Sequence, residues 1–159
     1  YIQSRIFSFF NRDRDTGTHN FQSDKAIDSI TSGGFFGKGI GEGTLKNQVP
    51  EAHTDYIISV ISEEFGVVAI ILILLLFLMF IYMVFKKINY EKSDKIKLVL
   101  IGCVSLILMQ VTIHVGVNIR LFPTTGMTLP FLSYGGSSII SISILSGIIL
   151  NLTKRKINN

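Results

Sequence analysis

The fold class is decided by residues 66–85, GVVAIILILLLFLMFIYMVF, a run of twenty residues without a charged side chain. At about 1.5 Å of rise per residue, a helix of this length covers the roughly 30 Å hydrocarbon core of a bilayer. A chain of 159 residues is too small to surround such a helix with protein on all sides. We therefore expect a transmembrane helix over residues 56–85.

Two more uncharged runs follow, at residues 98–119 and 139–152. The first is the more polar of the two, and we expect its His114 to hydrogen-bond to a neighbouring span. The second reaches spanning length if its helix covers residues 134–152, and its serines suit close packing of helices. The chain is thus predicted to be an all-α polytopic membrane protein with three spans.

Basic residues predict the orientation of these spans. The loop 86–97 contains five lysines and two acids, and the tail 153–159 adds three basic residues. Basic loops are retained in the cytoplasm, so both segments are expected there. Segment 1–55 and a loop over residues 120–133 are then expected on the extracytoplasmic side.

The composition excludes several other classes of protein. Apolar residues make up 48% of the chain and charged residues 16%, which excludes a disordered chain. A single cysteine, Cys103, excludes a disulfide framework or a cysteine-rich zinc site. The net charge of +4 follows from the basic residues of the predicted topology. Because the chain has no contiguous basic and aromatic patch, we expect no nucleic-acid partner.

The outer segment is polar and punctuated by glycines. Residues 16–34, TGTHNFQSDKAIDSITSGG, place apolar side chains at near-helical spacing. Thr16 or Thr18 could cap such a helix and Gly33 could end it. We expect a short helix that lies at the outer membrane–water boundary.

A glycine-rich stretch follows at residues 33–43, GGFFGKGIGEG. It does not match a Walker A motif, because Gly39 stands where Ser or Thr should follow Lys38. Two interpretations remain open. The stretch is either a flexible surface loop, or its backbone amides and Lys38 lie near the diphosphate of a membrane-bound substrate.

Three acids lie at the start of the first span, in residues 49–66, VPEAHTDYIISVISEEFG. Carboxylates near hydrocarbon are costly, so Asp55, Glu63 and Glu64 are candidates for functional groups. If the helix begins near Thr54, Glu63 lies about 80° round from Asp55 and Glu64 lies opposite Asp55. Asp55 could act as a base. It could equally cap the helix, but capping does not explain the two glutamates further along.

The last distinctive segment is FPTTGMTLPFLSYGGSS, residues 122–138. Pro123 and Pro130 prevent a regular helix. Irregular backbone near a membrane must be buried in protein or line a wet cavity. We expect a re-entrant loop that folds back into the bundle, with a plain connecting turn as the alternative.

Three motifs together, GGFFGKGIGEG, PEAHTDYIISVISEEFG and PTTGMTLPFLSYGGSS, resemble the SEDS family of bacterial membrane proteins. The similarity runs from about Ser8 to Leu152. Ala52 and the phrase GMTLPFLSYGGSS favour the FtsW-like branch over the RodA-like branch, although Thr125 stands where FtsW-like sequences usually have Lys. The resemblance implies a ten-span fold, of which this chain would be the large extracytoplasmic loop and the last three spans.

The resemblance also implies an activity, the polymerisation of peptidoglycan from lipid II. Asp55 would be the general base for the attacking 4-hydroxyl of the acceptor sugar, and Glu63 would support it. The leaving group would be an undecaprenyl diphosphate, with a divalent cation, Mg²⁺ or Mn²⁺, as its counter-charge. Substrate contacts would come from the glycine-rich loop, the HTD motif and the SYGGSS segment: Lys38, Gly39, His53, Thr54, Ser133, Tyr134, Gly135, Gly136 and Ser137.

The implied partners are lipid II, membrane lipid, a class B penicillin-binding protein and other proteins of the division machinery. The implied location is the inner membrane at the division septum. Two alternatives stay open. One is a flippase for the same lipid, although acids that cluster at the outer end of one span favour chemistry there over a transport path. The other is an inactive fragment that acts as a scaffold.

Overall fold

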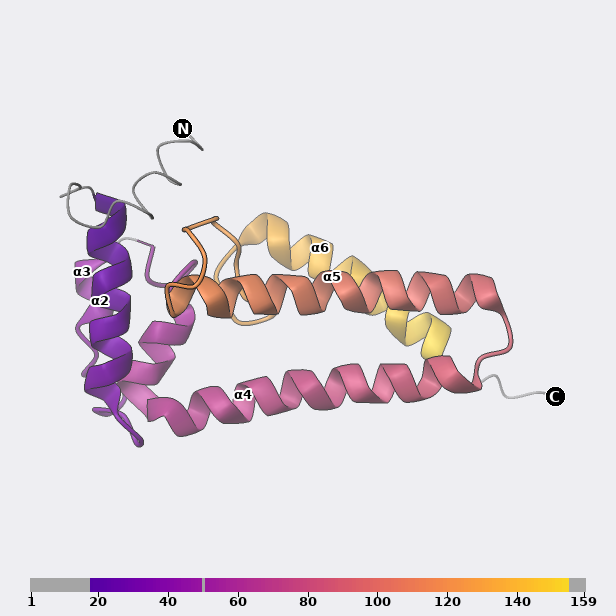
Figure 1. The fold of residues 1–159 in the computed structure, drawn as a ribbon, viewed down its shortest axis with the longest axis horizontal. Helices are drawn as coiled ribbons and strands as arrows, with labels where there is room; N and C mark the ends of the chain where they lie inside the picture. Colours follow the sequence, from indigo (N-terminus) through magenta and orange to yellow (C-terminus); the bar gives the residue numbers. More distant parts are fainter. Residues whose placement is uncertain (1–17, 50, 155–159) are drawn as a thin grey trace.

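The computed structural model describes residues 18–49 and 51–154, and helices joined by turns and loops make up this part of the chain (Figure 1). No strand occurs among the described residues, which confirms the predicted all-α class. The helices are α2 (Thr18–Gly33), α3 (Leu45–Gln48), α4 (Ile57–Tyr90), α5 (Asp94–Asn118) and α6 (Gly136–Thr153).

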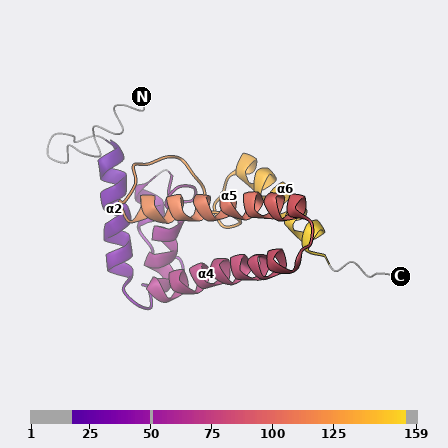
Figure 2. The same ribbon diagram turned by 45° about the vertical axis from the view of Figure 1, so that its right-hand side comes forward.

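Three of these helices, α4, α5 and α6, are long and apolar enough to cross a membrane. α4 and α5 form an antiparallel hairpin, and α6 packs against both of them. α2 stands across the hairpin at the end where α4 begins and α5 ends (Figures 1 and 2). Large apolar side chains remain exposed along the spans, as expected for helices that are apolar on all sides.

The predicted loop 86–97 is wrong over most of its length. α4 continues to Tyr90 and α5 begins at Asp94, so only residues 91–93 interrupt the helices. The charge pattern indicates which residues leave the hydrocarbon, but lysine is a good helix former and lets both helices continue beyond it. α6 begins at Gly136, two residues after the predicted start of the third span.

α2 covers the residues for which a short helix is predicted and ends at Gly33. Thr16 and the basic residues from position 155 onward lie outside the described residues. The Tyr56 hydroxyl lies 3.2 Å from that of Ser23 and links α2 to the start of α4. An apolar cluster at this end of the hairpin contains residues from α2, α3, the turns before α4, α4 itself and α5: Ala26, Leu45, Val49, Ala52, Tyr56, Val60 and Val117.

α4 is interrupted at Gly66, where the backbone leaves the helical region with φ 80° and ψ 176°. The glycine-rich loop supplies partners for the backbone groups that this break releases. Lys38 N–H donates to Glu63 O at 2.8 Å, and Val67 N–H donates to Gly34 O at 3.0 Å. The loop is therefore hydrogen-bonded to the break in α4, and α4 consists of a short outer segment and a long apolar segment.

This close approach requires glycine on both sides. A Cβ on Gly66 would lie 2.1 Å from Phe35 O, and a Cβ on Gly37 would lie 2.2 Å from Glu64 O. Both residues also have positive φ, near 80°. The glycines thus serve contact between two backbones, and the loop is not a free surface segment.

Candidate functional site

Asp55 lies in a run of turns, residues 51–56, that leads into α4. The helix begins at Ile57, one residue after the predicted start of the span, so Asp55 lies before the helix. Tyr56 occupies the cap position, and no side chain caps the helix there. Asp55 N–H instead donates to Glu51 O at 3.0 Å. Helix capping therefore does not explain why a carboxylate stands at position 55.

Asn118, at the end of α5, holds the backbone of Asp55. Its Nδ2 donates to Asp55 O and to His114 O, both at 2.9 Å. Its Oδ1 accepts from Ser59 Oγ at 2.7 Å and from Ser59 N–H at 3.2 Å. Asn118 is fully buried, and these four bonds use its amide group. The Asp55 turn, the first turn of α4 and the end of α5 are thus fixed to one another.

The irregular loop between α5 and α6 packs against the same turn. Ser133 Oγ donates to Thr54 O at 2.7 Å and accepts from Leu129 N–H at 2.8 Å. A Cβ placed on Gly126 would lie 3.9 Å from Asp55 Oδ2, so this loop passes directly beside the carboxyl group. Asp55 itself is only 9% exposed. The loop folds back onto the bundle and encloses Asp55.

A hollow of about 350 Å³ opens beside Gly126, between the loop, α5 and α6. Its wall combines apolar side chains with polar groups of Gln110, Thr128 and Ser141. Gly126 lines this hollow and also lies beside the Asp55 carboxyl group, so this residue is shared by the hollow and the surroundings of Asp55.

The structure brings part of the predicted substrate-binding set together beside Asp55. Tyr134 N–H donates to His53 O at 3.0 Å, and both side chains are exposed. Ser133 is buried, and its hydroxyl is already paired within the protein. The remaining predicted residues of this segment lie at the start of α6: Gly135 at its N-cap, then Gly136 and Ser137 in its first turn.

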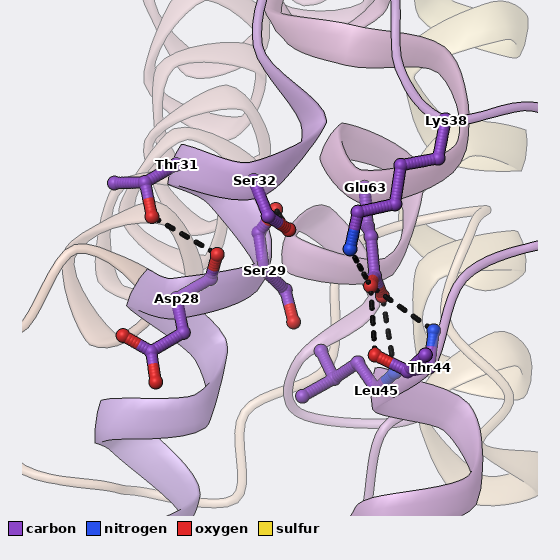
Figure 3. A network of polar contacts seen from close by, with 8 residues as sticks. All are labelled: Asp28, Ser29, Thr31, Ser32, Lys38, Thr44, Leu45 and Glu63. Carbon is purple, nitrogen blue, oxygen red and sulfur yellow. Dashed lines mark hydrogen bonds and ion pairs between the residues drawn. The ribbon is translucent and has the colours of Figure 1, made fainter.

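Glu63 lies with the glycine-rich loop. Its carboxylate accepts hydrogen bonds from Lys38 Nζ at 2.9 Å, from Thr44 N–H and Thr44 Oγ1 at 3.0 Å, and from Leu45 N–H at 3.0 Å (Figure 3). Glu63 is only 1% exposed. A buried carboxylate with a cation and three further donors is fully compensated. We call this group of residues, Lys38, Thr44, Leu45 and Glu63, the Glu63 anchor.

The Glu63 anchor bears on three predicted site residues. Glu63 accepts its hydrogen bonds from residues of the 38–45 segment, so any support of Asp55 would act through that segment. The amides of Lys38 and Gly39 donate to carbonyls of α4, and the Lys38 ammonium pairs with Glu63. These groups have partners within the protein, and their binding of a diphosphate stays a prediction.

Sequence reasoning missed how α5 contributes to the site. His114 is expected to bond to a neighbouring span, but its Nδ1 lies 2.7 Å from Met127 O in the loop before α6. Gln110 Nε2 donates to Thr128 O at 2.9 Å. The spacing of Gln110, His114 and Asn118, four residues apart in an apolar helix, is a signal that could have revealed one polar face.

The predicted divalent cation concerns the acidic and histidine side chains of the described residues. Within residues 18–49 and 51–154, no three His, Cys, Asp or Glu side chains come together as metal ligands.

Comparison with known proteins agrees with these motifs. A family model for FtsW, RodA and SpoVE, described as cell cycle protein, matches residues 1–158. The chain is 37% identical to a probable peptidoglycan glycosyltransferase FtsW of Enterococcus hirae over 99% of this chain and 40% of that protein. It is 38% identical to the protein of the same name from Borreliella burgdorferi, over 100% of this chain and 44% of the relative.

A solved structure shares the fold. It concerns the coordination of polymerization and crosslinking by a peptidoglycan synthase complex. One of its chains matches with a TM-score of 0.64 and 27% identity, over 95% of this chain and 40% of that chain. The chain thus spans about two fifths of the length of the relatives it matches. These matches confirm the resemblance drawn from the motifs, and the chain belongs to the FtsW/RodA/SpoVE family of multi-pass membrane proteins.

Proposed function

We propose that this chain forms the outer loop and the last three spans of a peptidoglycan glycosyltransferase that polymerises lipid II during septal wall synthesis. The family and the names of the relatives support this activity. The observation that carries the proposal is the placement of Asp55. Its carboxyl group is largely buried, its backbone is fixed by Asn118, and it faces Gly126 at the edge of a hollow.

In the proposed reaction, the Asp55 carboxylate takes the proton from the 4-hydroxyl of the acceptor sugar. The hydroxyl oxygen forms a bond to C1 of the donor sugar. The bond between C1 and the diphosphate oxygen breaks, and undecaprenyl diphosphate leaves with the bonding electrons. A base can do this only within hydrogen-bond reach of the hydroxyl, which the approach from the side of Gly126 would allow.

The residues around Asp55 would position the sugars. His53 and Tyr134 expose their side chains next to the HTD turn, and their backbones are hydrogen-bonded to each other. An exposed aromatic ring and an imidazole offer both stacking and polar contacts to a saccharide. A divalent cation, Mg²⁺ or Mn²⁺, would serve as the counter-charge of the diphosphate.

A flippase is the competing function. Transport of a charged headgroup favours ionisable groups along a path through the spans. The described acids of α4 lie instead near its outer end, and α5 and α6 contain no acid beyond Asp94 in the first turn of α5. This distribution supports chemistry at one face of the membrane. A purely scaffolding role is the other alternative. It would not need an Asp55 that is fixed and enclosed, so the structure around Asp55 gives it no support.

We further propose a class B penicillin-binding protein and other division proteins as partners, and the inner membrane at the septum as the location. The solved relative from a synthase complex that couples polymerization to crosslinking supports a crosslinking partner.

Asp55→Asn in the protein as encoded by its gene tests the activity. A general base contributes about 10²–10⁴-fold to the rate, so polymer formation from lipid II should fall by that factor. Insertion and partner binding should persist. Asp28→Asn, the same change on the exposed side of α2, is the matched control and should polymerise normally. Near-normal polymerisation by Asp55→Asn would overturn the proposed role.

A further inference from the structure

Three polar side chains of α5 lie one turn apart on a single face of the helix. Gln110, His114 and Asn118 are spaced by four residues, which places them in a row along an apolar span. His114 and Asn118 are fully buried, and Gln110 is partly buried. Burial of polar groups is costly unless they are hydrogen-bonded. The hydrogen-bond partners of these three side chains therefore indicate what the side chains do.

All three donate to backbone carbonyls of the two irregular segments around Asp55. Gln110 Nε2 donates to Thr128 O at 2.9 Å, and Asn118 Nδ2 donates to Asp55 O at 2.9 Å. His114 Nδ1 lies 2.7 Å from Met127 O, and it must be the donor because a carbonyl oxygen can only accept. Each of these donors reaches a main-chain oxygen, and Asn118 also accepts from the N–H and the hydroxyl of Ser59 through its Oδ1.

These bonds set the position of the turn 51–56 relative to the loop 122–134. Neither segment is regular structure, so neither provides its own ladder of hydrogen bonds. α5 is a continuous helix from Asp94 to Asn118, and its repeat fixes the spacing of the three donors. The approach of Gly126 to Asp55 and the wall of the hollow that Gln110 and Thr128 share both depend on this spacing.

We propose that Gln110, His114 and Asn118 form a positioning ladder, which holds the Asp55 turn and the Gly126 loop in register along α5. They are positioning residues and act on the reaction only through the backbone they hold. The catalytic consequence rests on the proposed function of Asp55, whereas the structural effect does not.

His114 offers a conservative variant. With Nδ1 protonated, its Nε2 is an acceptor, and it is buried without a hydrogen-bond partner among the described residues. Only the Nδ1 side of the ring therefore contributes to the ladder. The Nδ2 of an asparagine occupies nearly the place of the histidine Nδ1. His114→Asn should keep the donor to Met127 O, whereas His114→Leu should lose it.

Hydrogen exchange of the protein as encoded by its gene, in lipid nanodiscs, tests the ladder segment by segment. Loss of one hydrogen bond to a buried carbonyl should make local exchange about tenfold faster or more, which corresponds to about 1.4 kcal/mol. His114→Leu and Gln110→Leu should act on the loop 122–134. Asn118→Leu should act first on the turn 51–56.

The matched control is Thr112→Val, on the opposite side of α5, where the hydroxyl bonds only to Leu108 O of the same helix. It should leave exchange in both segments unchanged, and His114→Asn should do the same. In polymerisation assays, His114→Leu should lower kcat by about tenfold with little change of KM, because positioning is lost while binding groups remain.

The outcomes separate the ladder from the proposed function. Unchanged exchange in both segments for His114→Leu and Gln110→Leu would overturn the ladder whatever the activity. If these variants open the loop while Asp55→Asn polymerises normally, the ladder stands and the proposed function fails. If Asn118→Leu does not insert, the other two variants still decide, since each removes a single bond to the loop.

Discussion

Two carboxylates of one short segment, Asp55 and Glu63, are both buried, yet the protein fixes them in different ways. Glu63 is fixed by its side chain, because Lys38, Thr44 and Leu45 direct their donors to its oxygens. Asp55 is fixed by its backbone, which Asn118 holds from α5, and its carboxyl group faces Gly126.

The difference teaches that burial alone does not identify a catalytic acid. A carboxylate near hydrocarbon is by default a candidate for function, and both residues meet that criterion. Glu63 joins a loop to a broken helix, so its burial has a structural explanation. For Asp55, the fixed backbone and the neighbouring hollow are the observations that support its proposed role as a base.

The largest expected effect on folding comes from the break in α4, which the backbone of the glycine-rich loop bridges. In Gly66→Ala, the new Cβ would meet Phe35 O at 2.1 Å, and the positive φ adds about 1–3 kcal/mol of strain. The glycine-rich loop should detach, with a loss of at least about 3 kcal/mol in the free energy of unfolding. Thermal unfolding in detergent measures this loss.

Gly102→Ala is the matched control, because a Cβ there meets nothing within 4 Å. It should be neutral or stabilise α5 by up to about 1 kcal/mol, since alanine favours helix over glycine. A Gly66→Ala variant as stable as this control would show that the loop does not depend on the break.

The next effect compares the two carboxylates directly. Glu63→Gln removes the charge that Lys38 pairs with and turns an amide donor toward Thr44 and Leu45, so it should cost about 3 kcal/mol of stability. Asp55→Asn leaves the bond from Asn118 in place and should lower the unfolding temperature much less. The measurement is thermal unfolding of both variants beside the wild type. Equal losses would remove the distinction between a structural and a functional carboxylate.

The sequence was sufficient for the spans and for α2, because uncharged runs and helical spacing are local properties. It misplaced the connection between α4 and α5, since lysines mark the end of the hydrocarbon but not the end of a helix. It also placed Gly66 inside an uninterrupted helix over residues 56–85, whereas the helix is broken there. Gly66 has a positive φ, and the backbone groups freed there are hydrogen-bonded to a loop about thirty residues earlier in the chain.

Only part of the arrangement around Asp55 is local in the sequence. Asp55 and its neighbours His53 and Thr54 stand in one motif, and their meeting with the SYGGSS segment was implied only by the resemblance. The bonds from Asn118 to Asp55 and from Lys38 to Glu63 join residues 63 and 25 positions apart. No local pattern encodes such pairs, although the four-residue spacing of polar side chains in α5 points to a polar face.

The smallest expected effect separates the two interpretations of Lys38. The residue is about one-third exposed in its side chain, so solvent weakens its attraction to Glu63, and Lys38→Met should cost only about 1 kcal/mol. Glu63 would keep its three bonds from Thr44 and Leu45. In the double variant Lys38→Met/Glu63→Gln, the loss should be smaller than the sum of the single losses by about 1 kcal/mol, because both changes break one ion pair.

The polymerisation rate of the single variant Lys38→Met completes the comparison. If Lys38 serves only the Glu63 anchor, Lys38→Met should lower the unfolding temperature slightly and leave the rate at low temperature nearly unchanged. If Lys38 also meets the diphosphate of the substrate, KM should rise several-fold while the unfolding temperature stays within the small shift of the ion pair. Such a rise would show that a residue of the Glu63 anchor takes part in substrate binding. Lys38 would then belong both to the Glu63 anchor and to the substrate site.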